Sequence, residues 1–106
     1  MTSARRPSHT EDIISSLRDK RDIERFTAAR VLLQRHLVLK RDILHGKDFL
    51  FSGSSAEIHG ALKNLVGIEH QSSRFLQFDY TRIDDYFLLR IVGESKFQQT
   101  IDSYFD

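Results

Sequence analysis

The chain has 106 residues, of which 40% are hydrophobic and 29% charged, a balance typical of a single globular domain. It contains no cysteine. This excludes disulfides, thiolate metal sites and cysteine nucleophiles, and it favours a reducing compartment, so we expect a cytoplasmic protein. The net charge of +1 excludes a strong overall attraction to polyanions.

Residues 1–9 include two arginines, but no apolar run follows them. We therefore expect a flexible N-terminal tail rather than a signal peptide. No stretch approaches the roughly 18 apolar residues that a membrane-spanning helix needs, so no membrane association is expected. Residues 10–106 are predicted to form one domain.

The pattern of residues 10–45 is typical of helices. Thr10 suits an N-cap, because acidic residues follow it. A long helix is expected from about residue 22 to 45, where Gly46 suits a C-terminal cap. Whether residues 10–45 form one helix or two stays open, because Asp19 could cap a second helix.

Three later segments have the apolar patterning of strands, and they are residues 48–52, 74–81 and 86–92. Two helices are predicted to begin at capping boxes, one of Ser54 with Glu57 and one of Ser95 with Gln98. The predicted fold is α+β. Two N-terminal helices, the second long, precede a small three-stranded sheet in β-α-β-β-α order, with the helices mostly on one face.

The predicted long helix has apolar residues on several sides. It would span about 36 Å, whereas a domain of this size has a radius of gyration of only about 13 Å. Surplus apolar surface of this kind is most simply buried by a second copy of the chain. We therefore predict a homodimer through the interface residues Leu32, Val38, Leu39 and Ile43.

Two alternatives to this dimer remain open. In the first, the chain's own strands, its last helix and lysine or arginine stems cover the long helix. In the second, the helix ends near residue 35, and residues 36–40 are extended.

An anion or small-ligand site is considered near the loop of residues 52–55, with Ser54, Ser55 and Arg90 as its candidate residues. Backbone N–H groups at a helix N-terminus can bind anions, although turn and capping chemistry explains the loop by itself. Arg90 interrupts an apolar strand, where a charge requires a partner. The candidate partners are Asp79 across the hairpin or an acidic ligand.

A nucleic-acid contact is considered on Arg18, Arg21 and Arg25, which recur at helical spacing. Acidic residues alternate with them, as on an ordinary solvated helix face. The five histidines are dispersed, and one Asp42-x-x-His45 pair without a second copy does not make a di-iron motif. No metal site and no cofactor are expected.

Taken together, these features favour a non-enzymatic protein–protein interaction or regulatory module that self-associates through the long helix, with a further protein partner expected. The alternatives are a nucleic-acid-binding regulator that uses the basic stripe, and a small-ligand or enzymatic site near residues 52–55. Replacing Ser54 with alanine is expected to reduce stability by about 1 kcal/mol.

Overall fold

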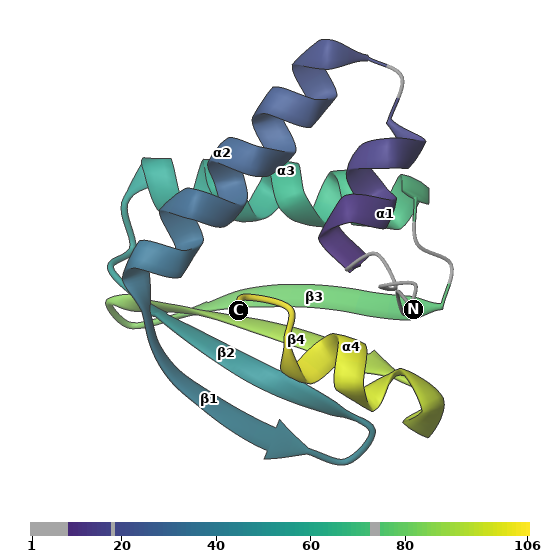
Figure 1. Cartoon of the computed structure of the whole chain (residues 1–106). Helices are drawn as coiled ribbons and strands as arrows, with labels where there is room; N and C mark the ends of the chain where they lie inside the picture. The colour runs from purple at the N-terminus through teal and green to yellow at the C-terminus, as the bar shows by residue number, and fades with distance from the viewer. Residues whose placement is uncertain (1–8, 18, 73–74) are drawn as a thin grey trace.

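The computed structural model describes residues 9–17, 19–72 and 75–106 of the chain, as a four-stranded antiparallel sheet with helices (Figure 1). The elements in chain order are α1 (His9–Ser16), α2 (Lys20–His36), β1 (Leu37–Ile43), β2 (Gly46–Ser52), α3 (Ala56–Ser72), β3 (Leu76–Ile83), β4 (Tyr86–Gly93), the 3-10 turn η1 (Ser95–Phe97) and α4 (Gln98–Asp102). The strand order is β1-β2-β4-β3, and all three pairings are antiparallel.

The predicted three-stranded fold with a helix continuing to residue 45 is wrong. Residues 37–43 form the edge strand β1, which pairs with β2 and makes the sheet four-stranded. The spacing of Leu33, Leu37 and Leu44 suits a helix, but every second residue from Leu39 also lies on one face of a strand. Pairing with β2 decides the outcome, because it satisfies backbone groups that a helix would otherwise satisfy internally.

Helix α2 is therefore shorter than predicted, and it begins and ends at defined residues. Asp19 is its N-cap, and the carboxylate accepts a hydrogen bond of 2.8 Å from the backbone N–H of Arg21. The helix ends at His36 after 17 residues, or about 26 Å. The alternative in which the helix ends near residue 35 and an extended segment follows agrees with the structure.

The predicted helix starts later in the chain need a correction as well. Ser55, rather than Ser54, caps α3, because its hydroxyl accepts a hydrogen bond of 3.3 Å from the backbone N–H of Ile58. At the last helix, neither η1 nor α4 has a side-chain N-cap. There, the side-chain amide of Gln98 donates to the carboxylate of Asp102 at 2.9 Å.

The sheet has one covered face and one open face. All four helices belong to the covered side, where α2 and α3 lie together above the strands and the C-terminal residues return beneath α2 (Figure 1). We call this side the inner face. On the opposite face of the sheet, no helix in residues 9–17, 19–72 or 75–106 packs against the strands. We call this side the outer face.

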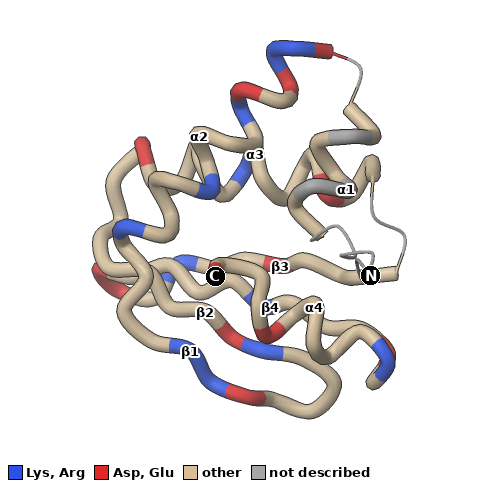
Figure 2. The backbone as a smooth tube through the Cα atoms, viewed as in Figure 1, with Lys and Arg blue, Asp and Glu red and all other residues tan. Residues whose placement is uncertain are grey.

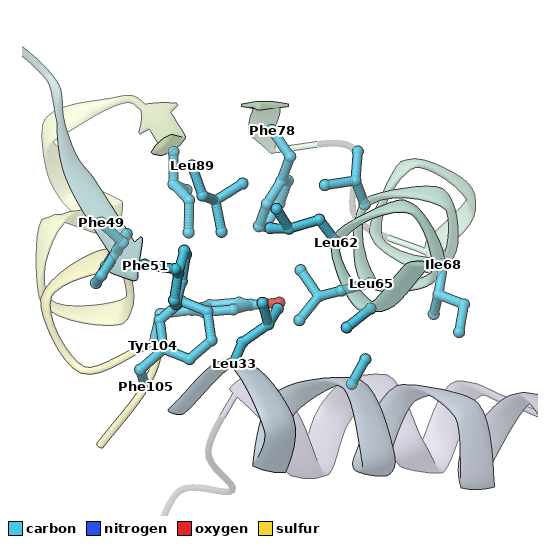
Figure 3. Packing of buried hydrophobic residues seen from close by; sticks show 14 of the residues in the cluster. Leu33, Phe49, Phe51, Leu62, Leu65, Ile68, Phe78, Leu89, Tyr104 and Phe105 are labelled. Atoms are coloured by element: carbon cyan, nitrogen blue, oxygen red, sulfur yellow. The ribbon is translucent and has the colours of Figure 1, made fainter. Parts of the chain in front are cut away.

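The hydrophobic core fills the space between the inner face and the helices. Phe105 packs edge-to-face against Phe49 and Phe51, with ring centroids 5.0 and 5.4 Å apart. Leu33 of α2 lies near Tyr104 and Phe105, and Leu62 of α3 lies near Phe78 of β3 (Figure 3). The C-terminal residues are thus part of the core, and among the described residues every helix lies on the inner face.

Candidate functional site

The outer face carries a row of alternating charges that crosses all four strands. Antiparallel pairing places four residues side by side, and in strand order they are Arg41 of β1, Asp48 of β2, Arg90 of β4 and Asp79 of β3. We call these four residues the charge ladder. Residues directly opposite each other on paired strands lie about 5 Å apart on the same face, so each charge has its opposite as a neighbour. Basic and acidic segments lie beside one another on β1 and β2 in Figure 2.

Asp48 is the centre of this ladder and is almost fully buried, with 2% of its surface exposed. Arg90 donates to both carboxylate oxygens, from Nε at 2.8 Å and from Nη2 at 2.9 Å. Arg41 adds a third hydrogen bond at 3.0 Å. The two arginines therefore cover the carboxylate on the outer face, while the side chains of Arg90 and Arg41 themselves remain 48% and 66% exposed.

The hydrogen bonds from Arg90 lower the pKa of Asp48 below its ordinary value of 3.8. Burial opposes this effect, and Arg41 lowers the pKa further. Asp48 is therefore held in its charged form between the two arginines. The sequence correctly indicates that Arg90 needs a partner, but the partner in the structure is Asp48 rather than Asp79.

An apolar row lies directly beside the charge ladder. Leu39, Leu50 and Leu88 occupy neighbouring register positions on β1, β2 and β4, and Ile83 and Tyr86 extend the row at the β3–β4 turn. Leu39 is 54% exposed, Ile83 46% and Tyr86 42%. We call these five residues the apolar row. Together with Arg41 and Asp48 they line a shallow depression of about 250 Å³. The outer face thus combines exposed apolar side chains with a preformed ion pair.

The predicted interface residues do not form one stripe. Leu39 and Ile43 lie on the outer face of β1, and Val38 is the extra residue of a β-bulge, where it is 55% exposed. Leu32 lies on α2 and packs against the core on the inner side. The sequence reasoning missed Leu50, Leu88, Tyr86 and Ile83, whose common face depends on the pairing of distant strands.

The predicted anion site does not assemble. Arg90 pairs with Asp48, which lies four residues before Ser52 along an extended strand, or about 13 Å away. Ser55 is engaged in capping α3, and Ser54 is half-buried in the same loop. The loop of residues 52–55 and Arg90 are therefore too far apart to bind one small anion.

The predicted nucleic-acid stripe is only partly described, because Arg18 lies outside the described residues. Arg21 and Arg25 are exposed on α2. Asp22 and Glu24 alternate with them, and Figure 2 shows acidic and basic segments interleaved along the first turns of α2. Arg25 also borders a depression of about 380 Å³ between α2 and α3. This mixture of charges gives no continuous basic surface.

A second buried acidic side chain lies inside the core, on the inner side of the sheet. Glu69 of α3 is 0% exposed, and it accepts a hydrogen bond from the hydroxyl of Tyr104. The Nε2 atom of His9 lies 3.0 Å from a carboxylate oxygen of Glu69. Burial, followed by the charge of Glu69, raises the pKa of Tyr104 well above its ordinary value. These contacts join α1, α3 and the C-terminal residues, so their role is structural.

No group of three or more histidine, cysteine, aspartate or glutamate side chains in the described parts of the chain is arranged to hold a metal ion. No helix within residues 9–17, 19–72 and 75–106 combines the length and the apolar character required to cross a membrane. Comparison of the chain with protein-family models, with curated proteins and with solved structures finds no match.

Proposed function

We propose that the protein is a small cytoplasmic protein–protein interaction module that binds a second copy of itself through the outer face of its sheet. The observation that carries this proposal is the uncovered apolar row beside a preformed ion pair. Exposed apolar side chains gathered on one face are typical of interaction sites. The proposal replaces the long-helix interface with a sheet face and keeps Leu39 and Ile43 in it.

The buried state of Asp48 supports docking on this face. A charge normally opposes association, because a partner must remove its hydration water. Asp48 has already lost most of its contact with water, and three hydrogen bonds from two arginines compensate for that loss. A partner that covers Asp48 therefore meets little further desolvation at this carboxylate.

A second copy suits this face because the ladder holds two positive and two negative side chains. A partner of one charge sign would face repulsion from half of them. Strands about 4.8 Å apart with a rise of about 3.3 Å per residue give a four-stranded, seven-residue face a flat footprint of about 440 Å². Two such faces bury about 900 Å², which is below the roughly 1,200 Å² of a standard stable interface. We therefore expect a weak dimer that dissociates on dilution.

The test is the solution mass of the wild type and of two leucine variants over a wide concentration range. Leu39→Glu places a charge in the apolar row at a position that is 54% exposed, so the fold should tolerate it. Leu44→Glu is the matched control, because Leu44 is 84% exposed in the β1–β2 turn, outside the apolar row. Circular dichroism confirms that each variant is folded.

Sedimentation equilibrium should show a concentration-dependent dimer for the wild type and for Leu44→Glu, and a monomer for Leu39→Glu. A wild type that stays monomeric up to millimolar concentration would contradict the proposal. So would a Leu39→Glu variant that is folded and dimerises as tightly as the wild type.

A further inference from the structure

The order of charges on the outer face sets the orientation of two facing copies. We propose that the two copies stack face to face about a two-fold axis parallel to the strands, so that the charge ladders of the two copies run antiparallel. This inference rests on the proposed self-association and adds the geometry of the pair. It assigns the ends of the ladder, Arg41 and Asp79, as the residues that specify the partner.

Symmetry leaves few ways to place one outer face on another. Two faces related by a two-fold axis require that axis to lie between them, parallel to both sheets. An axis along the ladder keeps every strand over its own equivalent, so it would put each charge over itself or over an uncharged row of the partner. An axis along the strands instead reverses the ladder, so that Arg41 lies over the partner's Asp79 and Asp48 lies over the partner's Arg90.

The same two-fold axis, parallel to the strands, also brings the apolar rows of the two copies together. Reversal across the strands keeps every row over its own equivalent, so that Leu50 lies over the partner's Leu88 and Leu88 over the partner's Leu50. Leu39 lies over the partner's Thr81, which ends the same register row on β3. The axis along the strands therefore matches both opposite charges and apolar side chains, whereas an axis along the ladder never places opposite charges over each other.

The ends of the ladder are more exposed to solvent than its centre. Asp48 and Arg90 already bind each other through two hydrogen bonds. Arg41 uses one nitrogen on Asp48 and is 66% exposed, and Asp79 is exposed on the edge strand β3. Packed sheets lie about 10 Å apart, a gap that an arginine and a facing aspartate can bridge. Such pairs fix orientation and exclude wrong partners more than they add affinity.

Reversing the charge at either end of the ladder, and then mixing the two variants, tests the proposed orientation of the dimer. Arg41→Asp leaves acidic residues at both ends of the ladder, and Asp79→Arg leaves basic residues at both ends. Each variant should self-associate at least about tenfold more weakly than the wild type, because both end contacts become like-charged. An equimolar mixture should form heterodimers, because each end contact in the mixed pair is again between opposite charges.

The double variant Arg41→Asp/Asp79→Arg should recover self-association, since both reversals occur in one chain. Asp48 keeps its two hydrogen bonds from Arg90 in every variant, so folding should persist, and circular dichroism checks this. Should Arg41→Asp fail to fold, Arg41→Gln replaces it. Its heterodimer with Asp79→Arg should then be tighter than the Asp79→Arg homodimer.

Sedimentation of fluorescently labelled chains separates the outcomes. A dimeric wild type whose single variants dimerise normally, or whose mixture gains nothing, overturns the proposed axis and leaves self-association standing. A monomeric wild type overturns the proposed function and this inference together. Recovery in the mixture and in the double variant supports the antiparallel ladder, because no common structural defect would be repaired by mixing.

Discussion

Replacing Asp48 with asparagine tests the electrostatic centre of the outer face. The substitution keeps the size of the side chain and removes its charge, so three charge-assisted hydrogen bonds from Arg41 and Arg90 are weakened. Such bonds contribute about 1.5–3 kcal/mol each when buried. The two arginine side chains are 66% and 48% exposed and can bind water instead, which reduces the loss.

We expect Asp48→Asn to lower the free energy of unfolding by about 1–2 kcal/mol at pH 7, equivalent to a fall in Tm of about 5–10 °C. Asp79→Asn is the matched control on the same ladder, and it should change stability by less than about 0.5 kcal/mol, because Asp79 is exposed. Urea denaturation at low protein concentration measures both variants without a contribution from self-association.

The difference in the free energy of unfolding between the wild type and Asp48→Asn should depend on pH in a definite direction. The pKa of Asp48 in the folded protein is lower than its ordinary value of 3.8, so folding favours the charged form. The stability that Asp48 contributes is therefore fully present above about pH 5 and is lost as the pH falls through the folded-state pKa. The gap between wild type and Asp48→Asn should shrink below about pH 4. A gap that is absent at pH 7, or that persists unchanged at pH 3, would refute this reasoning.

Two further pairs of substitutions test local features of the fold by urea denaturation. Ser55→Ala should reduce the free energy of unfolding by about 0.5–1 kcal/mol through the lost α3 cap, and Ser54→Ala should reduce it by less; the reverse order would show that Ser54 is the cap after all. Gly46→Ala should destabilise the fold by about 3 kcal/mol, because the added Cβ would lie 2.1 Å from the carbonyl oxygen of Ile91. Gly60→Ala meets nothing within 4 Å in α3 and should instead stabilise the protein by about 0.5–1 kcal/mol, so equal effects of the two glycine variants would contradict the close approach at Gly46.

Local signals in the sequence predict several features of the fold correctly. Asp19, which the sequence marks as a possible cap of a second helix, is the N-cap of α2. The apolar run 86–92 indicates a central strand and β4 is one, although the expectation that both of its faces are covered is wrong, because Tyr86 and Arg90 on its outer face are exposed. Both signals depend on residues close together in the chain. By contrast, the segment 37–43 fits a helix by its spacing and a strand by its alternation. Pairing with the partner strand β2 decides that this segment is a strand rather than a helix.

The candidate site depends on contacts between distant residues, and local patterns do not contain them. The need of Arg90 for a partner is visible in the sequence, whereas its pairing with Asp48, 42 residues away, follows from the register of β2 with β4. The expectation of surplus apolar surface around Leu39 agrees with its exposure, although the element that presents it is a strand rather than a helix. Leu32 is not part of the candidate site, because it lies on α2 and packs against the core on the inner side of the sheet.

Methyl NMR during dilution tests the central claim most directly, namely that the outer face of the sheet is the surface that two copies share. The leucine methyl groups of Leu39, Leu50 and Leu88 should shift together as the concentration falls from millimolar to micromolar. Leu32 and the core residue Leu33 should keep their positions throughout. Shifts confined to Leu32 and the helices, or no shifts at any concentration, would contradict the account.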